Sequence, residues 1–420
     1  MKEVQERLSG LRVCMLVSNN VSIDARVRKE AETLARAGAD VIVIGVGDEV
    51  PEDIALKAPY RLILASQTVS GKPLQPKLGK AHVWRPLRVL VNMTVTASRQ
   101  KRYAMQQDES GYVAPIARQD MIETAKPYQF DIVHAHDLDT LYAGSQIAHA
   151  NNALLVYDSH ELFLALHFLN ENSRRDGAIV EAEVFPHIDA LVTVSPQIAD
   201  RLCEQYNRYD LDPVVLFNGG VRTMDRVTPV GKPVRLFFQG AFAPDRNLVE
   251  LVEAMGQLRE KATLTLQGWG PDEESIREMI ARKSLEGVVE IIPPCPPFEV
   301  VESASKFDVG IINSIAKDEN FLVTLPNKLF DYMSAGLAIA STDLPPIKEI
   351  IEKESCGITY AQNGVESTAK VLQSLIENPD RIMQMKQASL DAAPKYAWDA
   401  QAKKLINLYA ALKDKIDEVG

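Results

Sequence analysis

The sequence has few of the features that mark several common classes of protein. Its 420 residues include only four cysteines, and no two of them form a CxxC pair, which argues against a zinc site or a disulfide framework. No uninterrupted apolar run approaches the ~18 residues that a membrane-spanning helix needs. The opening residues, MKEVQERLSGL, are too polar for a signal peptide. We therefore expect reduced thiols and a cytoplasmic protein.

Net positive charge is also absent. The formal net charge is −11, with 46 Lys and Arg against 57 Asp and Glu, which argues against nucleic acid as the main partner. Acidic residues are missing from one long stretch, however, because 60–107 contains nine Lys and Arg and no Asp or Glu. Apolar residues alternate with these cations, which is typical of a segment on an anionic membrane surface or an acidic acceptor. A solvated basic surface is the alternative.

The glycines of a dinucleotide-binding fingerprint are missing as well. The apolar run at 11–17 is followed by SNNVSID at 18–24 and not by GxGxxG, which counts against a nicotinamide dehydrogenase. Helical periodicity at 24–37 and a second apolar run at 40–47 come next. This β-α-β order predicts a parallel sheet. Such sheets bind ligands at the carboxyl ends of their strands, so the 18–24 loop lies where chemistry is expected.

Apolar runs alternate with helical segments through the rest of the chain. Further strands are expected at 130–137, 153–163, 189–195, 213–220, 234–240, 263–270, 288–294, 307–313 and 337–342. The cluster of glycine, proline and polar residues at 218–232 is the best linker candidate. The sequence thus predicts an α/β protein with two doubly wound parallel-sheet domains that face a cleft. We expect these domains at 1–222 and 223–395, with a C-terminal helix at 396–420 that packs back on the first.

Ionisable side chains follow two neighbouring strands of the first half. His136 and Asp137 end one apolar run, and His160 and Glu161 follow the next. Because carboxyl ends of parallel strands meet at one edge, these side chains form a candidate site, with capped loop residues as the alternative. Asp137 and Asp139 also spell the DxD of metal-dependent sugar transferases. We expect Asp139 to cap the next helix instead, and we expect no metal.

The stretch TLPNKLFDYMSAG at 324–336 predicts a short helix with a binding site at its start. Thr324 can cap the first amides, and Pro326 suits the first turn. Lys328 and Asp331 share a face, so a cation near the positive end of the helix dipole is followed by a carboxylate. This suits a nucleotide diphosphate, with phosphates at the amides and Lys328 and ribose hydroxyls at Asp331. An amphipathic helix with a solvated Lys–Asp pair is the alternative.

The order of these motifs resembles that of retaining glycosyltransferases with the two-Rossmann (GT-B) fold, specifically family 4, or glycosyl transferases group 1. The segments that carry the resemblance are DARVRKEAETLARAGADVIVI at 24–44, DIVHAHDLDTLYAG at 131–144, VYDSHELF at 156–163, LFNGGV at 216–221, QGAFAPDRNLVELVEA at 239–254, LTLQGWGP at 264–271 and LPNKLFDYMSAGLAIA at 325–340. The resemblance implies transfer of a sugar, with retention, from a nucleotide-sugar such as a UDP- or GDP-sugar. It implies no metal and no cofactor.

The resemblance also implies roles for single residues. The donor nucleotide would be bound by Gly240, Arg246, Gly268, Pro326, Asn327, Lys328 and Asp331. The catalytic residues would be His136, Asp137, Arg246 and Lys328, and the acceptor side would include Asn20, Asp24, Arg26, His160 and Glu161. In the front-face mechanism implied, the departing diphosphate takes the acceptor proton. The protein then mainly stabilises the charge of the leaving group.

Three positions depart from the family pattern. Val323 stands where relatives have the first glutamate of an E-x7-E pair, Ala241 stands where many have an arginine, and 18–24 lacks the usual glycines. These departures leave open a non-catalytic subunit of a glycan-assembly system, and a sugar-nucleotide epimerase is a third interpretation. The expected acceptor is a cell-surface glycan or a lipid-linked precursor. If 60–107 binds lipid, the protein would work at the inner face of the cell membrane.

Overall fold

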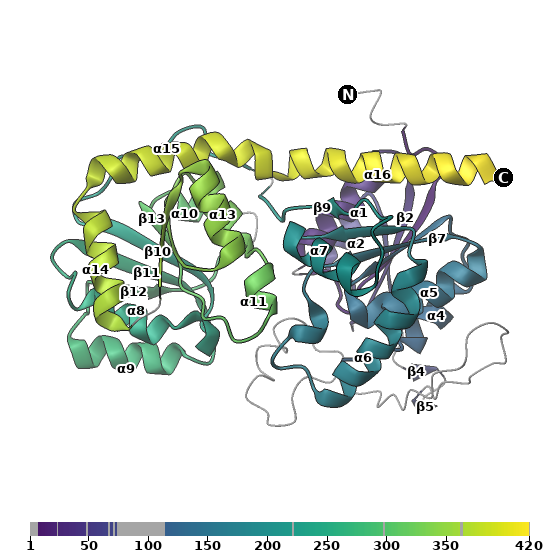
Figure 1. Ribbon diagram of the computed structural model, residues 1–420, viewed down its shortest axis with the longest axis horizontal. Coiled ribbons are helices and arrows are strands. Elements are labelled where there is room, and N and C mark those ends of the chain that lie inside the picture. Colours follow the sequence, from purple (N-terminus) through teal and green to yellow (C-terminus); the bar gives the residue numbers. More distant parts are fainter. Residues whose placement is uncertain are drawn as a thin grey trace. The chain divides into compact units, whose positions relative to one another are not determined.

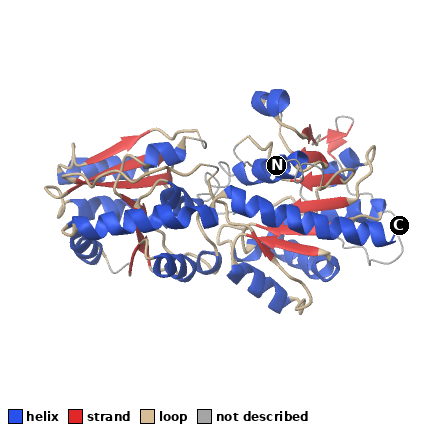
Figure 2. Cartoon of the chain, turned by 90° about the horizontal axis from the view of Figure 1, so that it is seen from above, coloured by secondary structure: helices blue, strands red, loops and turns tan. Residues whose placement is uncertain are grey.

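The computed structural model describes residues 7–22, 24–47, 49–65, 68–69, 72–73, 114–220, 222–296, 299–361 and 364–419. The chain divides into two compact units, residues 1–216 with 402–420 and residues 217–401. Figure 2 shows that each unit consists of helices packed around a sheet. Both main sheets are parallel, so the predicted α/β class with two Rossmann-like domains is confirmed.

The main sheet of the first unit has the strand order β3-β2-β1-β6-β7-β8-β9, and three of its strands, β2, β7 and β9, are labelled in Figure 1. Its strands are β1 Arg12–Leu16, β2 Asp40–Gly45, β3 Arg61–Leu64, β6 Ile132–His136, β7 Leu154–Ser159, β8 Ala190–Thr193 and β9 Val214–Val215. The order reverses between β1 and β6, and open parallel sheets bind ligands at such a reversal. A separate pair, β4 Thr68–Val69 and β5 Lys72–Pro73, is antiparallel. The other residues of the predicted basic segment beyond 65, namely 66–67, 70–71 and 74–107, lie outside the described residues.

The helices of the first unit are α1 Ala25–Arg36, α2 Glu52–Lys57, α4 Gln119–Ala125, α5 Leu138–Asn151, α6 Glu171–Val184 and α7 Pro196–Gln205, with 3-10 turns η2 Phe163–Ala165 and η3 Phe185–His187. The C-terminal helix α16, Trp398–Val419, packs on this unit through most of its length. Leu405, Tyr409 and Leu412 lie in the same hydrophobic cluster as the residues of β1.

Local sequence explains where the helices of this unit begin. The Asp24 side chain accepts a hydrogen bond from the Val27 amide at the start of α1. Ser195 accepts one from Ile198 at the start of α7, where Pro196 occupies the first helical position. Both arrangements satisfy amides that have no partner inside the helix. The loop at 18–24 is thereby tied to α1 at the carboxyl edge of the sheet.

The main sheet of the second unit has the order β12-β11-β10-β13-β14-β15. Its strands are β10 Val234–Ala241, β11 Ala262–Trp269, β12 Val289–Ile292, β13 Val309–Ile312, β14 Ala338–Thr342 and β15 Gly357–Tyr360. The helices are α8 Leu248–Met255, α9 Glu273–Lys283, α10 Val300–Ala304, α11 Asn320–Val323, α12 Asn327–Ser334, α13 Pro345–Glu354, α14 Val365–Ile376 and α15 Pro379–Tyr396, and Pro244–Arg246 forms the 3-10 turn η4. Among the described residues, no helix is both long and apolar enough to cross a membrane.

Strands β10 and β13 part towards their carboxyl ends. They pair only at Leu236 with Val309 and Phe237 with Gly310, whereas β10 stays paired with β11 to its last residue, Ala241. The strand order of this sheet also reverses between β10 and β13. The carboxyl end of β10 is therefore the edge at which a parallel sheet of this kind binds a ligand.

Helix α12 packs closely on this part of the sheet. A side chain at Gly310 would come within 2.3 Å of the Tyr332 ring, so the glycine allows the ring of α12 to lie directly on β13. The Tyr332 hydroxyl accepts a hydrogen bond of 3.0 Å from the Gln239 amide. These contacts fix α12 beside the carboxyl end of β10.

Candidate active site

Helix α12 begins later than the sequence suggests. Pro326 is extended, with φ −74° and ψ 141°, and the first helical residue is Asn327. Thr324 ends α11 and does not cap α12, so that expectation is wrong. The physical reason is that the residue before a proline is biased away from helical backbone, which prevents an earlier start. Pro326 and Asn327 thus lie at the N-terminus of α12, where backbone amides lack helical partners.

Lys328 extends from α12 to the end of β10. Its ammonium lies 4.0 Å from the ring centroid of Phe238, a cation–π contact. A side chain at Gly240 would approach Lys328 Nζ to 3.3 Å, so the glycine keeps space around the ammonium. Burial holds the pKa of Lys328 well below its usual value, and the nearby positive charge of Arg246 lowers it further, against opposing carboxylates. An anion bound here would relieve the repulsion between the two cations.

Arg246 connects the ends of β10 and β13. It ends the 3-10 turn η4 and donates a hydrogen bond of 3.0 Å from Nη1 to Ser314 Oγ. The guanidinium also lies 3.4 Å from Asp245 and 5.7 Å from the ring centroid of Phe321. Asn313 donates to the Arg246 carbonyl, which fixes the turn to the segment after β13. The side chain is thereby oriented while remaining partly exposed.

Gly268 and Asp331 complete this group. A side chain at Gly268 would lie 1.9 Å from the Gly240 carbonyl oxygen, so only glycine allows the ends of β10 and β11 to approach this closely. Asp331 lies one turn after Lys328 in α12, and its negative charge acts on the pKa of Lys328. The structure therefore brings Gly240, Arg246, Gly268, Lys328 and Asp331 together at the carboxyl edge of the second sheet.

The first unit contains a second group of charged residues, and it is buried. Arg26 Nη2 lies 2.9 Å from Asp158 Oδ1 and its Nε lies 2.9 Å from Glu30 Oε1. Three histidines surround Asp158 Oδ2, with His160 Nε2 at 3.0 Å, His136 Nδ1 at 3.3 Å and His134 Nε2 at 3.5 Å. All six side chains are almost inaccessible to solvent.

Burial and neighbouring charges set the protonation of this cluster in opposite directions. Burial alone would raise the pKa of Asp158, but Arg26 and His160 hold it well below its usual value. Burial alone would lower the pKa of His160, but Asp137 and Asp158 raise it to about 9. Burial lowers the pKa of His136 to about 3, whereas burial and the charge of Asp158 raise that of Glu30 to about 8. At neutral pH the cluster therefore holds a charged His160, an ionised Asp158 and a neutral His136.

Four residues of this cluster could in principle hold a metal ion. The ligand atoms of Glu30, His134, His136 and Asp158 lie within 4.8 Å of one another. However, the Arg26 guanidinium already lies 2.9 Å from both carboxylates and takes the place of a cation. A buried guanidinium cannot lose its proton to make room for a second positive charge. The geometry therefore favours a network of ion pairs over a metal centre.

The remaining first-unit residues predicted from the sequence have local contacts. Asp137 accepts a hydrogen bond of 3.0 Å from the His160 amide. Asn19 donates to Asp24, while Asn20 accepts from Ser22. The main-chain oxygen of Glu161 accepts a hydrogen bond from the Ser159 hydroxyl.

The prediction that Asp139 caps the following helix is wrong. Helix α5 begins at Leu138, and Asp137 occupies the capping position with a left-handed φ of 61°. Asp139 therefore lies within the first turn and is buried. The sequence gives little warning of this, because aspartate is a favoured capping residue at either position.

Sequence reasoning missed Glu30, His134, Asp158 and Tyr409. His134 lies two residues before His136 on β6, so strand periodicity alone places both rings on one face, and their centroids lie 4.3 Å apart. Tyr409 comes from α16, and its hydroxyl lies 2.7 Å from His134 Nδ1. No local signal could have predicted a partner so distant along the chain.

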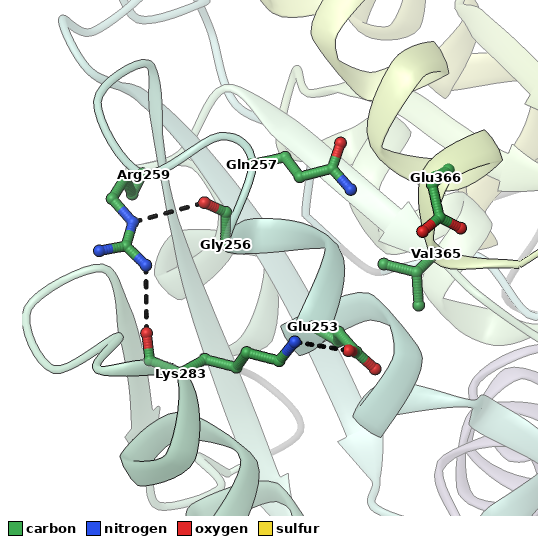
Figure 3. A pocket seen from close by; sticks show the side chains of 7 residues that line it. All are labelled: Glu253, Gly256, Gln257, Arg259, Lys283, Val365 and Glu366. Carbon is green, nitrogen blue, oxygen red and sulfur yellow. Dashed lines mark hydrogen bonds and ion pairs between the residues drawn. The ribbon is translucent and has the colours of Figure 1, made fainter.

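A pocket in the second unit does not contain any of these residues. Figure 3 shows that it is lined by Glu253, Gly256, Gln257, Arg259, Lys283, Val365 and Glu366. Its charged groups already pair with one another, since Lys283 lies 2.7 Å from Glu253 and Arg259 donates to the Lys283 carbonyl. Arg259 lies in the connection before β11, and Lys283 is the last residue of α9, before β12, so both lie towards the amino ends of these strands. The pocket is therefore not part of the candidate site.

Two Rossmann-like units of this kind define a GT-B glycosyltransferase fold. The structure aligns with sucrose-phosphate synthase from Thermosynechococcus elongatus at a TM-score of 0.70 and 16% identity, covering 96% of this chain and 100% of that one. It aligns with HepE from Anabaena, solved in complex with UDP, at a TM-score of 0.67 and 14% identity, again covering 96% and 100%.

Family models give a more specific assignment. The model of Glycosyltransferase Family 4 matches residues 25–224, and that of Glycosyl transferases group 1 matches residues 222–391. The chain belongs to this family of glycosyltransferases.

Curated relatives match over a smaller part of the chain. Putative colanic acid biosynthesis glycosyltransferase WcaL of Escherichia coli strain K12 is 26% identical over 143 residues, which are 33% of this chain and 35% of that protein. D-inositol 3-phosphate glycosyltransferase 1 of Catenulispora acidiphila is 22% identical over 311 residues, 67% of this chain and 72% of that protein. The match to the first relative thus spans about a third of its length.

Proposed function

We propose that the protein is a retaining glycosyltransferase that uses a nucleotide-diphosphate sugar and works without a metal ion. The observation that carries this proposal is the pair of cations, Arg246 and Lys328, at the carboxyl end of β10. Burial lowers the pKa of Lys328, and the positive charge of Arg246 lowers it further against the opposing charges of Asp245 and Asp331. A diphosphate would place negative charge between the two cations and make charge-assisted hydrogen bonds to both.

The leaving diphosphate is the group that needs stabilisation during transfer. Negative charge develops on it as the bond to the sugar breaks, and preorganised cations lower the energy of that charge. Arg246 is oriented by Ser314, and Lys328 is held over Phe238. The amides at the start of α12 add the positive end of a helix dipole. Asp331 would accept hydrogen bonds from the ribose hydroxyls.

His136 is proposed to orient a hydroxyl of the donor sugar or of the acceptor. Its Nδ1 faces Asp158 and His160, whereas its Nε2 has no hydrogen-bond partner among the described residues. Because the ring is neutral at physiological pH, it can donate or accept one hydrogen bond at Nε2. Asp137 would act through His160, because its carboxylate accepts a hydrogen bond from the His160 backbone amide.

The acceptor is proposed to be a glycan or a lipid-linked precursor. The name of one relative, which refers to colanic acid biosynthesis, supports a glycan, whereas another relative is named for inositol 3-phosphate, a small polyol phosphate outside this range. The UDP complex of HepE supports a uridine nucleotide as the first donor to test. Binding of 60–107 to the inner face of the cell membrane stays a prediction from charge.

A non-catalytic subunit of a glycan-assembly system is the second candidate. It is favoured by Val323 and Ala241, which replace charged residues of the family pattern. One experiment separates the two candidates. Purified protein is incubated with UDP- and GDP-sugars, with and without a lipid-linked acceptor and with a chelator, and released nucleoside diphosphate is measured.

We expect nucleoside diphosphate release that depends on the acceptor and survives the chelator. The anomeric configuration of the product, read by NMR, should match that of the donor. Inversion would contradict retention, and loss of activity with the chelator would contradict metal independence. Release without acceptor would indicate hydrolysis alone, and no turnover with any donor would favour the non-catalytic subunit.

A further inference from the structure

The donor-site residues of the second unit define a direction for a bound nucleotide. Lys328 marks the diphosphate at the end of β10, and Asp331 marks the ribose one turn further along α12. Gly240, beside which the Lys328 ammonium lies, pairs with Gly268 of β11, whereas β10 pairs with β13 only at Leu236 and Phe237. The end of β11, and not that of β13, therefore lies beside the proposed diphosphate position at Lys328.

Hydrogen bonds hold the residues near the end of β11 in fixed positions. Gln267 of β11 is buried and donates a hydrogen bond of 3.3 Å to the Pro293 carbonyl. Its Oε1 accepts hydrogen bonds from Ser303 Oγ at 3.0 Å and from Cys295 Sγ at 3.7 Å. The segment that follows β12 is thus tied to β11 by one side chain. It is held in place before any ligand binds.

Trp269 lies beside these residues, at the carboxyl end of β11. It is the last residue of β11, two residues after Gln267, so strand alternation places both side chains on the same face of the sheet. Its backbone is fixed, because it pairs with Ala241 and its carbonyl accepts a hydrogen bond of 2.9 Å from the Phe242 amide. The side chain nevertheless remains 47% exposed. A large aromatic ring is therefore presented to solvent from a rigid position.

Gln239 adds a polar group to the same face. It pairs with Gln267 in the sheet, and its Oε1 is buried without a hydrogen-bond partner among the described residues. A buried polar atom without a partner has an energetic cost that a ligand group can remove. The amide of Gln239 can provide a donor and an acceptor side by side.

We propose that Trp269 is the stacking platform for the nucleobase of the donor and that Gln239 hydrogen-bonds to that base. This inference rests on the proposed function of the second unit as the donor site. Stacking on Trp269 supplies affinity for any base, because every base has a π-face. Gln239 supplies discrimination, since only a base edge with matching groups satisfies its amide.

The test compares nucleotides with pyrophosphate, which shares the phosphate contacts but has no base. Calorimetry is run on the wild type, Trp269→Ala, Trp269→Phe and Gln239→Leu with UDP, GDP and inorganic pyrophosphate. We expect Trp269→Ala to weaken nucleotide binding about five- to a hundredfold and to leave pyrophosphate binding unchanged. Trp269→Phe should retain most of the affinity, because a phenyl ring still stacks. Gln239→Leu should weaken nucleotide binding only.

Fluorescence provides an independent readout. Nucleotide should quench the emission of the wild type, and this change should disappear in Trp269→Phe. Nucleotide affinity that is the same in Trp269→Ala and the wild type would overturn the inference while leaving the donor site standing. If the wild type bound neither nucleotide nor pyrophosphate, the proposed function would fail, and the inference would fail with it.

Discussion

Lys328 and Asp158 show how differently the two units hold a buried charge. Lys328 is placed beside a second cation, Arg246, and burial together with this neighbour lowers its pKa. Asp158 is a carboxylate surrounded by Arg26 and three histidines, and these groups already compensate it. A phosphate ligand is therefore favoured at Lys328. The cluster around Asp158 instead holds α1, β6 and β7 together.

The charge of His160 makes a pH dependence testable. Its pKa rises from about 6.5 in the unfolded chain to about 9 in the folded protein. A raised pKa means stability that is fully present below the unfolded value and is lost as pH rises through the folded one. We expect the unfolding free energy to fall between pH 6.5 and 9. His160→Asn should remove a large part of this fall, as measured by urea unfolding.

A matched control for that series is His149→Asn. His149 lies exposed near the end of α5, outside the cluster. This variant should keep the pH dependence of the wild type. An identical fall in His160→Asn and the wild type would mean that His160 is not the group whose proton stabilises the fold.

The sequence predicted some of these residues and missed others for a simple reason. Lys328 and Asp331 lie one turn apart, so helix geometry alone shows that they share a face. Arg26 and Asp158 are separated by 132 positions, and only the fold brings them together. The same holds for His134 and Tyr409, which are 275 positions apart.

Among the elements of the second unit, helix α15 is attached to the sheet by a buried ion pair. Lys386 Nζ lies 3.1 Å from Asp308 Oδ1, and neither side chain is exposed. Arg235 of β10 also pairs with Asp308 at 2.8 Å. These contacts join α15, β10 and the start of β13. They lie at the opposite ends of the strands from the candidate site.

Removal of one member of this pair should be costly. Lys386→Ala leaves part of the Asp308 charge uncompensated, and loss of a buried partner costs about 3–5 kcal/mol. The measurement is the denaturant midpoint of unfolding. Lys261→Ala is the control, because Lys261 and Glu377 form an exposed pair at 2.6 Å that contributes less than about 1 kcal/mol. Equal effects of the two substitutions would contradict this account.

The elements themselves were largely predictable. Apolar runs of strand length between helical segments specify a parallel sheet, and each expected strand contains a strand of the structure, although 153–163 is a strand only at Leu154–Ser159 and 213–220 only at Val214–Val215. The residues at which helices begin were predicted less accurately. Thr324 and Asp139 are both good capping residues by type, but a proline in one case and a left-handed Asp137 in the other decide where the helix begins.

For the whole molecule, the order of motifs was more informative than any single motif. The family follows from segments spread from 24 to 340, and the two family models cover that range. The acceptor does not follow, because it depends on the shape of a binding surface and not on spacing along the chain. The basic stretch 60–107 is the part of the sequence that most directly suggests where the acceptor is found.

For the whole molecule, the basic stretch 60–107 predicts binding to anionic membranes. The nine cations of 60–107 in a chain of net charge −11 should bind vesicles that contain anionic lipid. Co-sedimentation should fall as salt is raised from about 0.05 to 0.5 M, because the screening length shortens. A variant with Arg85, Arg88, Arg99 and Lys101 replaced by Gln should lose this binding. Equal recovery with neutral and anionic vesicles would contradict the prediction.

The central claim is that Lys328 and Arg246 form the binding site of a donor diphosphate. Calorimetry with UDP and GDP on the wild type and Lys328→Ala tests it most directly, with Lys348→Ala, a partly exposed lysine of α13, as the control. We predict that Lys328→Ala weakens binding by about ten- to a hundredfold, the scale of a charged hydrogen bond, and that the control binds as the wild type does. Equal affinity in all three proteins, or no binding by the wild type, would contradict the claim.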